Sequence, residues 1–197
     1  MKVNEHVLKR CLDVIEKDIL PLTKRAVTEG HNIFGAAVLL AKDLSLVTAG
    51  TNRRGLNPTW HGEIVTIGNF YNLHRRPDPK DTVFLSTHEP CSMCLSALAW
   101  CGFPEVLYLF GYEETHDDFA MPGDLDILAE IFATTVPTRE NRFFRMQSLQ
   151  EVVGGFENPR PWLERIATIR EAYKALVPIV LSSKASSGWG GDTRANT

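Results

Sequence analysis

Cysteine is scarce in this chain, and neither sign of charge is in large excess. Only 4 of the 197 residues are cysteine, and 21 Lys and Arg stand against 24 Asp and Glu. The cysteines are too few and too clustered for a disulfide scaffold. A formal net charge of −3 without a polybasic stretch disfavours a large polyanionic partner such as nucleic acid.

Long hydrophobic runs are also missing. The longest, at residues 34–41 and 106–110, are far shorter than the roughly 20 residues with which a helix crosses a bilayer. Charged residues recur throughout residues 1–20 and interrupt the apolar core that a secretory signal needs. We therefore expect a cytoplasmic protein with no membrane partner.

The overall composition is typical of a folded globular protein, with 44% apolar and 23% charged residues. A chain of this length favours one compact domain, which we expect over residues 1–181. Residues 182–197 are rich in Ser and Gly and contain Trp189 as their one large apolar side chain. This composition predicts a disordered tail.

Apolar periodicity and turn residues predict an alternation of helices and short strands. We expect a helix over residues 3–27 that is broken or kinked near Pro21. The other expected helices are 61–73, 91–102, 125–132 and 161–176, and the expected strands are 34–40, 46–52, 81–87 and 105–110. The first two strands should form a hairpin, and the last two should be parallel because a helix connects them. The pattern between residues 134 and 155 is ambiguous, and we assign no strand there.

Two short motifs carry metal-binding residue types. They are His61-Gly-Glu63 and Pro90-Cys91-Ser-Met-Cys94. Cysteines three residues apart in the first turn of a helix share a face, so they can hold one cation together. With His61 they form a Cys2His set, which favours zinc and leaves the fourth position open, as a catalytic zinc site requires.

Glu63 then needs a role beside the metal. On an ideal helix His61 and Glu63 lie about 200° apart, so both can face one pocket only from the first turn of the helix. A carboxylate there can take a proton from water and deliver it to a substrate nitrogen and then to a departing amine. The two motifs therefore predict hydrolytic deamination with Glu63 as the catalytic residue.

Other interpretations of these motifs are weaker but stay open. A C-x-x-C pair that opens a helix after a strand is also typical of thioredoxin-like redox sites. A structural zinc site in a non-catalytic protein would need a fourth ligand. Cys101 lies about 10 Å along the helix from Cys94, too far for that role. His88 could serve only by doubling back across the turn between strand and helix.

At these residues the sequence resembles the zinc-dependent cytidine and deoxycytidylate deaminase superfamily, whose signature is H-x-E followed by P-C-x-x-C. The segment from Cys94 to Pro104 is most similar to the free-base branch, which contains fungal-type cytosine deaminases and bacterial guanine deaminases. The resemblance covers residues 34–111. It implies an α/β fold of three layers, α-β-α, with a central mixed sheet of about five strands. It also implies that Asn52 and Phe34 bind the substrate ring.

The scarcity of basic surface independently favours a small substrate over RNA. We therefore expect a homodimeric, Zn2+-dependent hydrolase that releases ammonia from a nucleobase or nucleoside of the cytosine or guanine type. Asp117 and Asp118 follow the fourth expected strand and could accept hydrogen bonds from an exocyclic amine or a ring N–H. The alternatives are an RNA-editing enzyme similar to tRNA adenosine deaminases and a non-catalytic protein with structural zinc.

Overall fold

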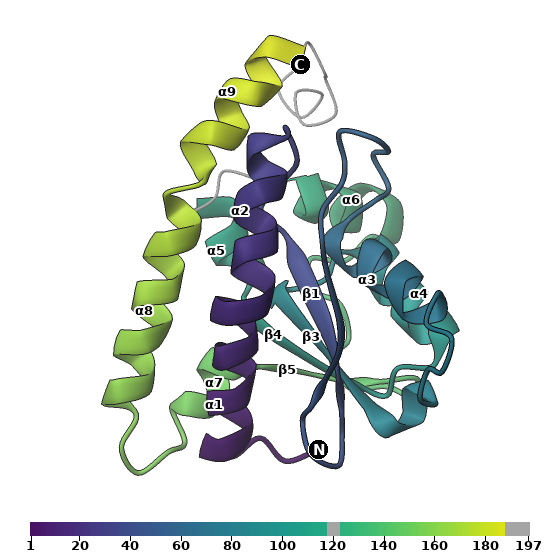
Figure 1. Cartoon of the computed structure of the whole chain (residues 1–197), viewed down its shortest axis with the longest axis vertical. Coiled ribbons are helices and arrows are strands. Elements are labelled where there is room, and N and C mark those ends of the chain that lie inside the picture. The colour runs from purple at the N-terminus through teal and green to yellow at the C-terminus, as the bar shows by residue number, and fades with distance from the viewer. Residues whose placement is uncertain (118–122, 188–197) are drawn as a thin grey trace.

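The sheet of this protein has five strands in the order β2-β1-β3-β4-β5 (Figure 1). The computed structural model describes residues 1–117 and 123–187. The strands are β1 (Gly35–Leu40), β2 (Leu46–Thr51), β3 (Thr82–His88), β4 (Glu105–Phe110) and β5 (Arg145–Ser148). The helices are α1 (Glu5–Val14), η1 (Ile15–Ile19), α2 (Leu20–Thr28), α3 (Gly62–Tyr71), η2 (Pro79–Asp81), α4 (Ser92–Cys101), α5 (Tyr112–Asp117), α6 (Gly123–Phe132), α7 (Leu149–Val153), α8 (Arg160–Lys174) and α9 (Val177–Ser187).

The strands pair in both directions, which makes the sheet mixed. β1 is antiparallel to β2 and β3, whereas β4 is parallel to β3 and β5. The expected hairpin and the expected parallel unit of β3, α4 and β4 are both confirmed. Gly35 pairs with Thr51, and Ala36 pairs with Ser86. The start of β1 and the ends of β2 and β3 therefore meet at one end of the sheet.

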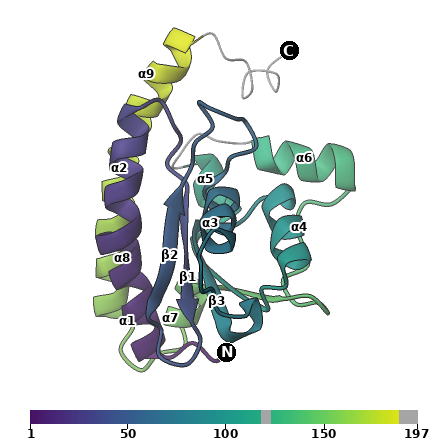
Figure 2. The ribbon, with the colours of Figure 1, turned by 45° about the vertical axis from the view of Figure 1, so that its right-hand side comes forward.

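Helices cover both faces of the sheet (Figure 2). α1, α2 and α8 lie on one face, and α3 and α4 lie on the other. The first face buries the larger apolar cluster, which includes Leu12, Leu85 and Ile169. The second face buries a smaller cluster around Phe84 and Phe103. The expected three-layer α/β architecture with a five-stranded mixed sheet is confirmed.

The N-terminal helix is interrupted, as the sequence predicts. Asn4 caps α1 by accepting a hydrogen bond from the backbone N–H of Val7 at 3.0 Å. The π-helical turn η1 separates α1 from α2, and Pro21 lies in the first turn of α2. Proline has no N–H to donate to the preceding turn, so the regular helical ladder breaks here.

Two parts of the C-terminal half differ from expectation. β5 and α7 occupy the stretch in which we assigned no strand. β5 is a four-residue edge strand in which Met146 and Ser148 are buried, but Met146 is its only apolar residue, so the sequence lacks the apolar alternation that reveals a strand.

Helix α9 crosses the expected domain boundary at residue 181, so residues 182–187 are helical. Val180 is buried on α9, and the hydroxyl groups of Ser182 and Ser183 donate to carbonyls three residues earlier. These bonds hold the serine side chains on their own helix. The rest of the expected tail, with Trp189, lies outside the described residues.

None of the helices in the described ranges combines the length and the apolar character that crossing a membrane requires.

Candidate metal centre

His61 stands at the start of α3, at the same end of the sheet as the start of β1. It is the N-cap residue, with an extended backbone, and Gly62 is the first helical residue. A Cβ on Gly62 would lie 2.7 Å from the carbonyl oxygen of Phe34 and 2.8 Å from Cα of Gly35. Only glycine allows this approach. The close contact brings His61 to the end of the sheet where β1 begins.

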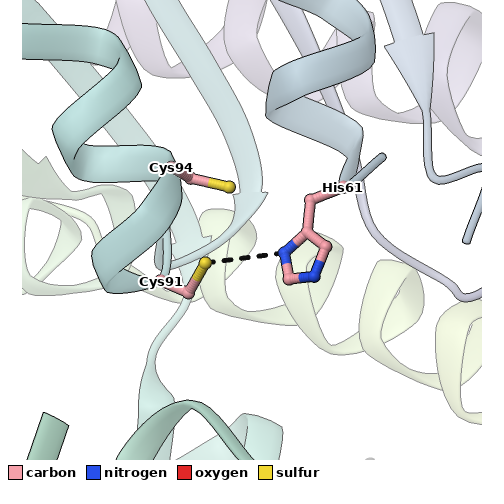
Figure 3. A group of neighbouring side chains, drawn as sticks. All are labelled: His61, Cys91 and Cys94. Carbon is pink, nitrogen blue, oxygen red and sulfur yellow. Dashed lines mark hydrogen bonds between the residues drawn. The ribbon is translucent and has the colours of Figure 1, made fainter. Parts of the chain in front are cut away.

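The two cysteines come from the start of α4, directly after β3. Cys91 is the N-cap residue of α4, and Cys94 lies in the first turn. The ligand atoms of His61, Cys91 and Cys94 all lie within 4.8 Å of one another, and Cys91 Sγ is 3.5 Å from His61 Nδ1 (Figure 3). The predicted three-residue group is therefore assembled in the structure.

The two cysteines of this group differ in acidity. The hydrogen bond from Cys94 and the proximity of His61 lower the pKa of Cys91 to about 4, although burial opposes them. Burial raises the pKa of Cys94 well above its ordinary value, and the neighbouring Cys91 adds to this. Two sulfurs and one imidazole nitrogen at these distances form a donor set that fits zinc.

Glu63 is buried beside the metal ligands, with 4% of its surface exposed. It lies in the first turn of α3, the position from which Glu63 and His61 can both face one pocket. Its Oε1 accepts a hydrogen bond from the Ser86 hydroxyl at 2.8 Å, and the Cys94 thiol points at its Oε2 at 3.4 Å. Burial, and secondly Cys91, raise its pKa. Burial makes this carboxyl group hold a proton more readily than an exposed one, as a proton carrier requires.

Asn52 follows β2 and has a fixed orientation. Its side-chain oxygen accepts hydrogen bonds from the backbone N–H groups of Asn32 at 3.2 Å and Arg54 at 2.9 Å. Its Nδ2 is buried and has no hydrogen-bond partner in the described part of the chain. Because a buried amide without a partner is costly, this nitrogen is ready to donate to a ligand.

Phe34 and His88 lie together at the same end of the sheet. Phe34 immediately precedes β1, and its ring meets the His88 ring edge-on, with centroids 4.8 Å apart. His88 also packs against Phe110 and Tyr173, and its Nδ1 is 2.9 Å from the Thr87 hydroxyl. Among the described residues, the metal group consists of three ligands, and His88 is not one of them. This placement disfavours His88 as a fourth ligand of a structural site.

Asp117 and Asp118 are the two acidic residues that we expect to accept hydrogen bonds from the substrate. Asp117 is the last residue of α5, and Asp118 lies outside the described ranges. Their hydrogen bonding to a substrate stays a prediction.

The sequence analysis missed two residues that support the site. Ser86 fixes the Glu63 carboxylate, and the backbone of Asn32 fixes the Asn52 amide. Ser86 could have been noticed as a polar side chain that directly follows the apolar run Val83-Phe-Leu85 of a buried strand. The contact with Asn32 joins two loops that are 20 residues apart, and no local pattern signals it.

Comparison with known proteins identifies relatives in the same superfamily. The family model of the cytidine and deoxycytidylate deaminase zinc-binding region matches residues 13–110. The guanine deaminase of Bacillus subtilis is 32% identical over an alignment of 110 residues, which covers 51% of this chain and 67% of that protein. The probable cytosine deaminase of Schizosaccharomyces pombe is 28% identical over 92 residues, 47% of this chain. The match spans only 56% of the yeast protein's length.

Solved structures give the same result for the fold. The X-ray structure of the guanine deaminase from Bacillus subtilis aligns with a TM-score of 0.50 and 25% identity, over 82% of this chain and 95% of that chain. A guanine deaminase from Nitrosomonas europaea aligns with a TM-score of 0.50 and 19% identity, over 80% of this chain and 81% of that chain. The second likeness bears on the fold alone.

Proposed function

The chain belongs to the cytidine and deoxycytidylate deaminase family, and from this premise we propose that it hydrolytically deaminates a small nucleobase or nucleoside of the cytosine or guanine type. The observation that carries the proposal is the group of three metal-binding atoms within 4.8 Å, with the buried carboxylate of Glu63 beside them. The names of the two relatives, a guanine deaminase and a probable cytosine deaminase, support a free base as substrate.

Zinc, held by His61, Cys91 and Cys94, would supply a Lewis acid that brings the pKa of a water molecule toward neutrality. Glu63 carries the protons in this proposal. Its carboxylate takes one proton from the attacking water and delivers it to the ring nitrogen beside the reacting carbon. It then takes the second proton from the hydroxyl group added to that carbon and passes it to the departing amine, which leaves as ammonia. The hydrogen bond from Ser86 keeps one carboxylate oxygen in place while the other takes part in these transfers.

The hydrogen bonds of the Asn52 side chain restrict which substrate atoms can bind to it. Because its oxygen already accepts two backbone hydrogen bonds, only its amino group remains to bind a ligand. The substrate ring must therefore offer an acceptor, either a carbonyl oxygen or an unprotonated ring nitrogen. Cytosine and guanine both carry such atoms, and Phe34 offers an aromatic edge near the same position.

A panel of substrates tests this proposal. Cytosine, guanine, adenine, their nucleosides, dCMP and tRNA should be assayed for ammonia release at low and high salt. We expect release from a free base or nucleoside with weak dependence on salt, because few phosphate contacts are involved. The purified protein should hold about one zinc ion per chain. Activity confined to tRNA and falling steeply with salt would favour RNA editing instead.

The variant Asn52→Ala sharpens the test. Losing a hydrogen bond of this type costs about 1–3 kcal/mol, so we expect kcat/KM to fall roughly 10- to 100-fold while zinc content stays unchanged. Asn69→Ala is a matched control, because Asn69 also donates its side-chain amide, but at the exposed end of α3. An Asn52→Ala enzyme as active as the wild type would remove Asn52 from the substrate site.

A further inference from the structure

Glu89 is a buried carboxylate that the proposed mechanism does not use. It lies between the end of β3 and Pro90, two residues before the metal ligand Cys91. Its side chain is only 1% exposed. A carboxylate buried to this degree needs a cation and hydrogen-bond donors, since an unpaired charge in the interior is strongly destabilising.

Two residues that follow β4, Arg139 and Tyr112, donate hydrogen bonds to this carboxylate. Arg139 donates to Glu89 through Nε at 3.2 Å and through Nη2 at 3.4 Å. The backbone N–H of Tyr112, at the start of α5, donates at 3.3 Å. The Tyr112 hydroxyl also donates to the carbonyl oxygen of Pro90 at 2.6 Å. The turn that leads to Cys91 is therefore held on both sides of Pro90.

Arg139 is itself held in place. Its Nη1 donates to Glu151 at 2.8 Å, and its guanidinium lies 5.5 Å from the centre of the Tyr108 ring. Its carbonyl oxygen accepts a hydrogen bond from Met146 in β5 at 2.7 Å. A guanidinium can address two carboxylates and an aromatic face at once because its donors form a rigid fork, which a lysine does not offer.

Cys91 directly follows Pro90, so a movement of this turn would displace it. It is the N-cap of α4, its carbonyl oxygen accepts the N–H of Leu95 at 2.8 Å, and its sulfur lies 3.5 Å from His61. Since Pro90 has no N–H, its carbonyl is the only polar backbone group with which this residue can be anchored. The contact with Tyr112 uses that group.

We propose that Arg139 is a positioning residue for the metal centre, which acts through Glu89 and together with Tyr112 to keep Cys91 in its binding position and so slow the release of zinc. This inference rests on the zinc site of the proposed function. Residues that hold metal ligands in position without binding the metal themselves typically lower metal affinity by about 10- to 100-fold when they are removed.

Zinc release from the loaded protein to an excess of a chromophoric chelator tests this inference. We expect Arg139→Gln to release zinc at least about tenfold faster than the wild type, and Arg139→Lys to lie between them because it keeps the charge without the fork. Arg165→Gln is a matched control. Arg165 is also a partly buried arginine that pairs with two acids, Asp13 and Glu16, but it joins α8 to α1. It should release zinc at the wild-type rate.

Tyr112→Phe provides a second variant if Arg139→Gln folds poorly. It removes only the hydrogen bond to Pro90, and we expect release a few-fold faster with little change in Tm. Wild-type release rates in Arg139→Gln, or in both Arg139→Lys and Tyr112→Phe, would overturn the inference. A wild-type protein that holds zinc but releases no ammonia from any base or nucleoside would refute the proposed function alone.

Discussion

The chain divides at Phe110 into two parts with different roles. The part up to Phe110 contains the three candidate metal ligands, Glu63 and Asn52, and it matches the family model from residue 13 to its last residue. The described residues after Phe110 add nothing to the metal group. They contribute instead the side chains behind it, such as Arg139 and Tyr112. The residues that we propose for catalysis therefore come from one contiguous segment, whereas Arg139 and Tyr112, which we propose to support them, follow it in the chain.

The second part shares the sheet and the larger apolar core with the first, and specific side-chain contacts also join them. Tyr173 of α8 packs against the ring of His88, which ends β3. Arg165 of the same helix pairs with Asp13 and Glu16 on the N-terminal helices. The two attachments differ in burial, because Tyr173 and His88 lie in the interior and the ion pairs lie near the surface. The following predictions separate the part that performs chemistry from the part that supports it.

The largest effect is expected at the metal ligands. Cys94→Ser should lose zinc and essentially all ammonia release, because a serine hydroxyl is a poor ligand for zinc. Zinc content can be measured by atomic absorption after gel filtration. Since metal binding is often coupled to folding, Tm should fall as well. Cys101→Ser is the matched control on the same helix. It should keep its zinc, and loss of zinc in both variants would mean that α4 is simply intolerant of serine.

Glu63→Gln should separate chemistry from metal binding within the first part. The amide keeps the size of the side chain but cannot carry a proton, so we expect kcat to fall by at least about 100-fold while zinc content and Tm stay near those of the wild type. Ser86→Ala removes one hydrogen bond to the carboxylate and leaves the carboxylate in place. It should lower kcat less. Unchanged turnover in Glu63→Gln would show that Glu63 does not carry the protons.

The sequence alone could predict most of the first part. Apolar runs with turn residues between them located β1 to β4, because buried strands leave clear runs. The spacing of His61, Glu63, Cys91 and Cys94 was enough to predict the metal group. These residues all sit at the starts of helices, where the order of residues along the chain determines the geometry directly.

The second part was harder to predict for a physical reason. β5 is short, polar and at the edge of the sheet, so its pairing with β4 depends on a neighbour 40 residues away in sequence. The same holds for Arg139, which reaches Glu89 across 50 residues. A lone arginine in an irregular segment carries no sign of a buried partner. Long-range polar contacts of this kind become visible only in three dimensions.

The pH dependence of the free energy of unfolding tests how deeply His88 is buried where the two parts meet. Burial lowers the pKa of His88 to about 3 from 6.5. Between these values the unfolded chain binds a proton that the folded chain does not. The free energy of unfolding should therefore fall as the pH drops below about 6.5, with a slope that approaches about 1.4 kcal/mol per pH unit.

His88→Leu should remove this contribution to the slope. Denaturant unfolding at pH 7.5, 6.0 and 5.0 measures it, and subtracting the variant from the wild type cancels the titration of the zinc ligands that both proteins share. His6→Gln, at an exposed histidine of α1, should retain the wild-type slope. Parallel pH profiles for His88→Leu and the wild type would show that His88 is accessible to protons in the folded protein.

The smallest effect is expected at the surface junction. Arg165 donates to Asp13 at 2.8 Å and to Glu16 at 3.3 Å, and its side chain is 23% exposed. Ion pairs with this access to solvent stabilise proteins by about 1 kcal/mol or less, and salt screens them. Arg165→Gln should therefore lower Tm by a few degrees at low salt and by less at 1 M NaCl. Arg160→Gln, which breaks an exposed pair with Glu164 within α8, should leave Tm unchanged. If Arg165→Gln instead lowered Tm as much at 1 M NaCl as at low salt, the loss would come from the packing of the arginine side chain against α1 and not from its charge.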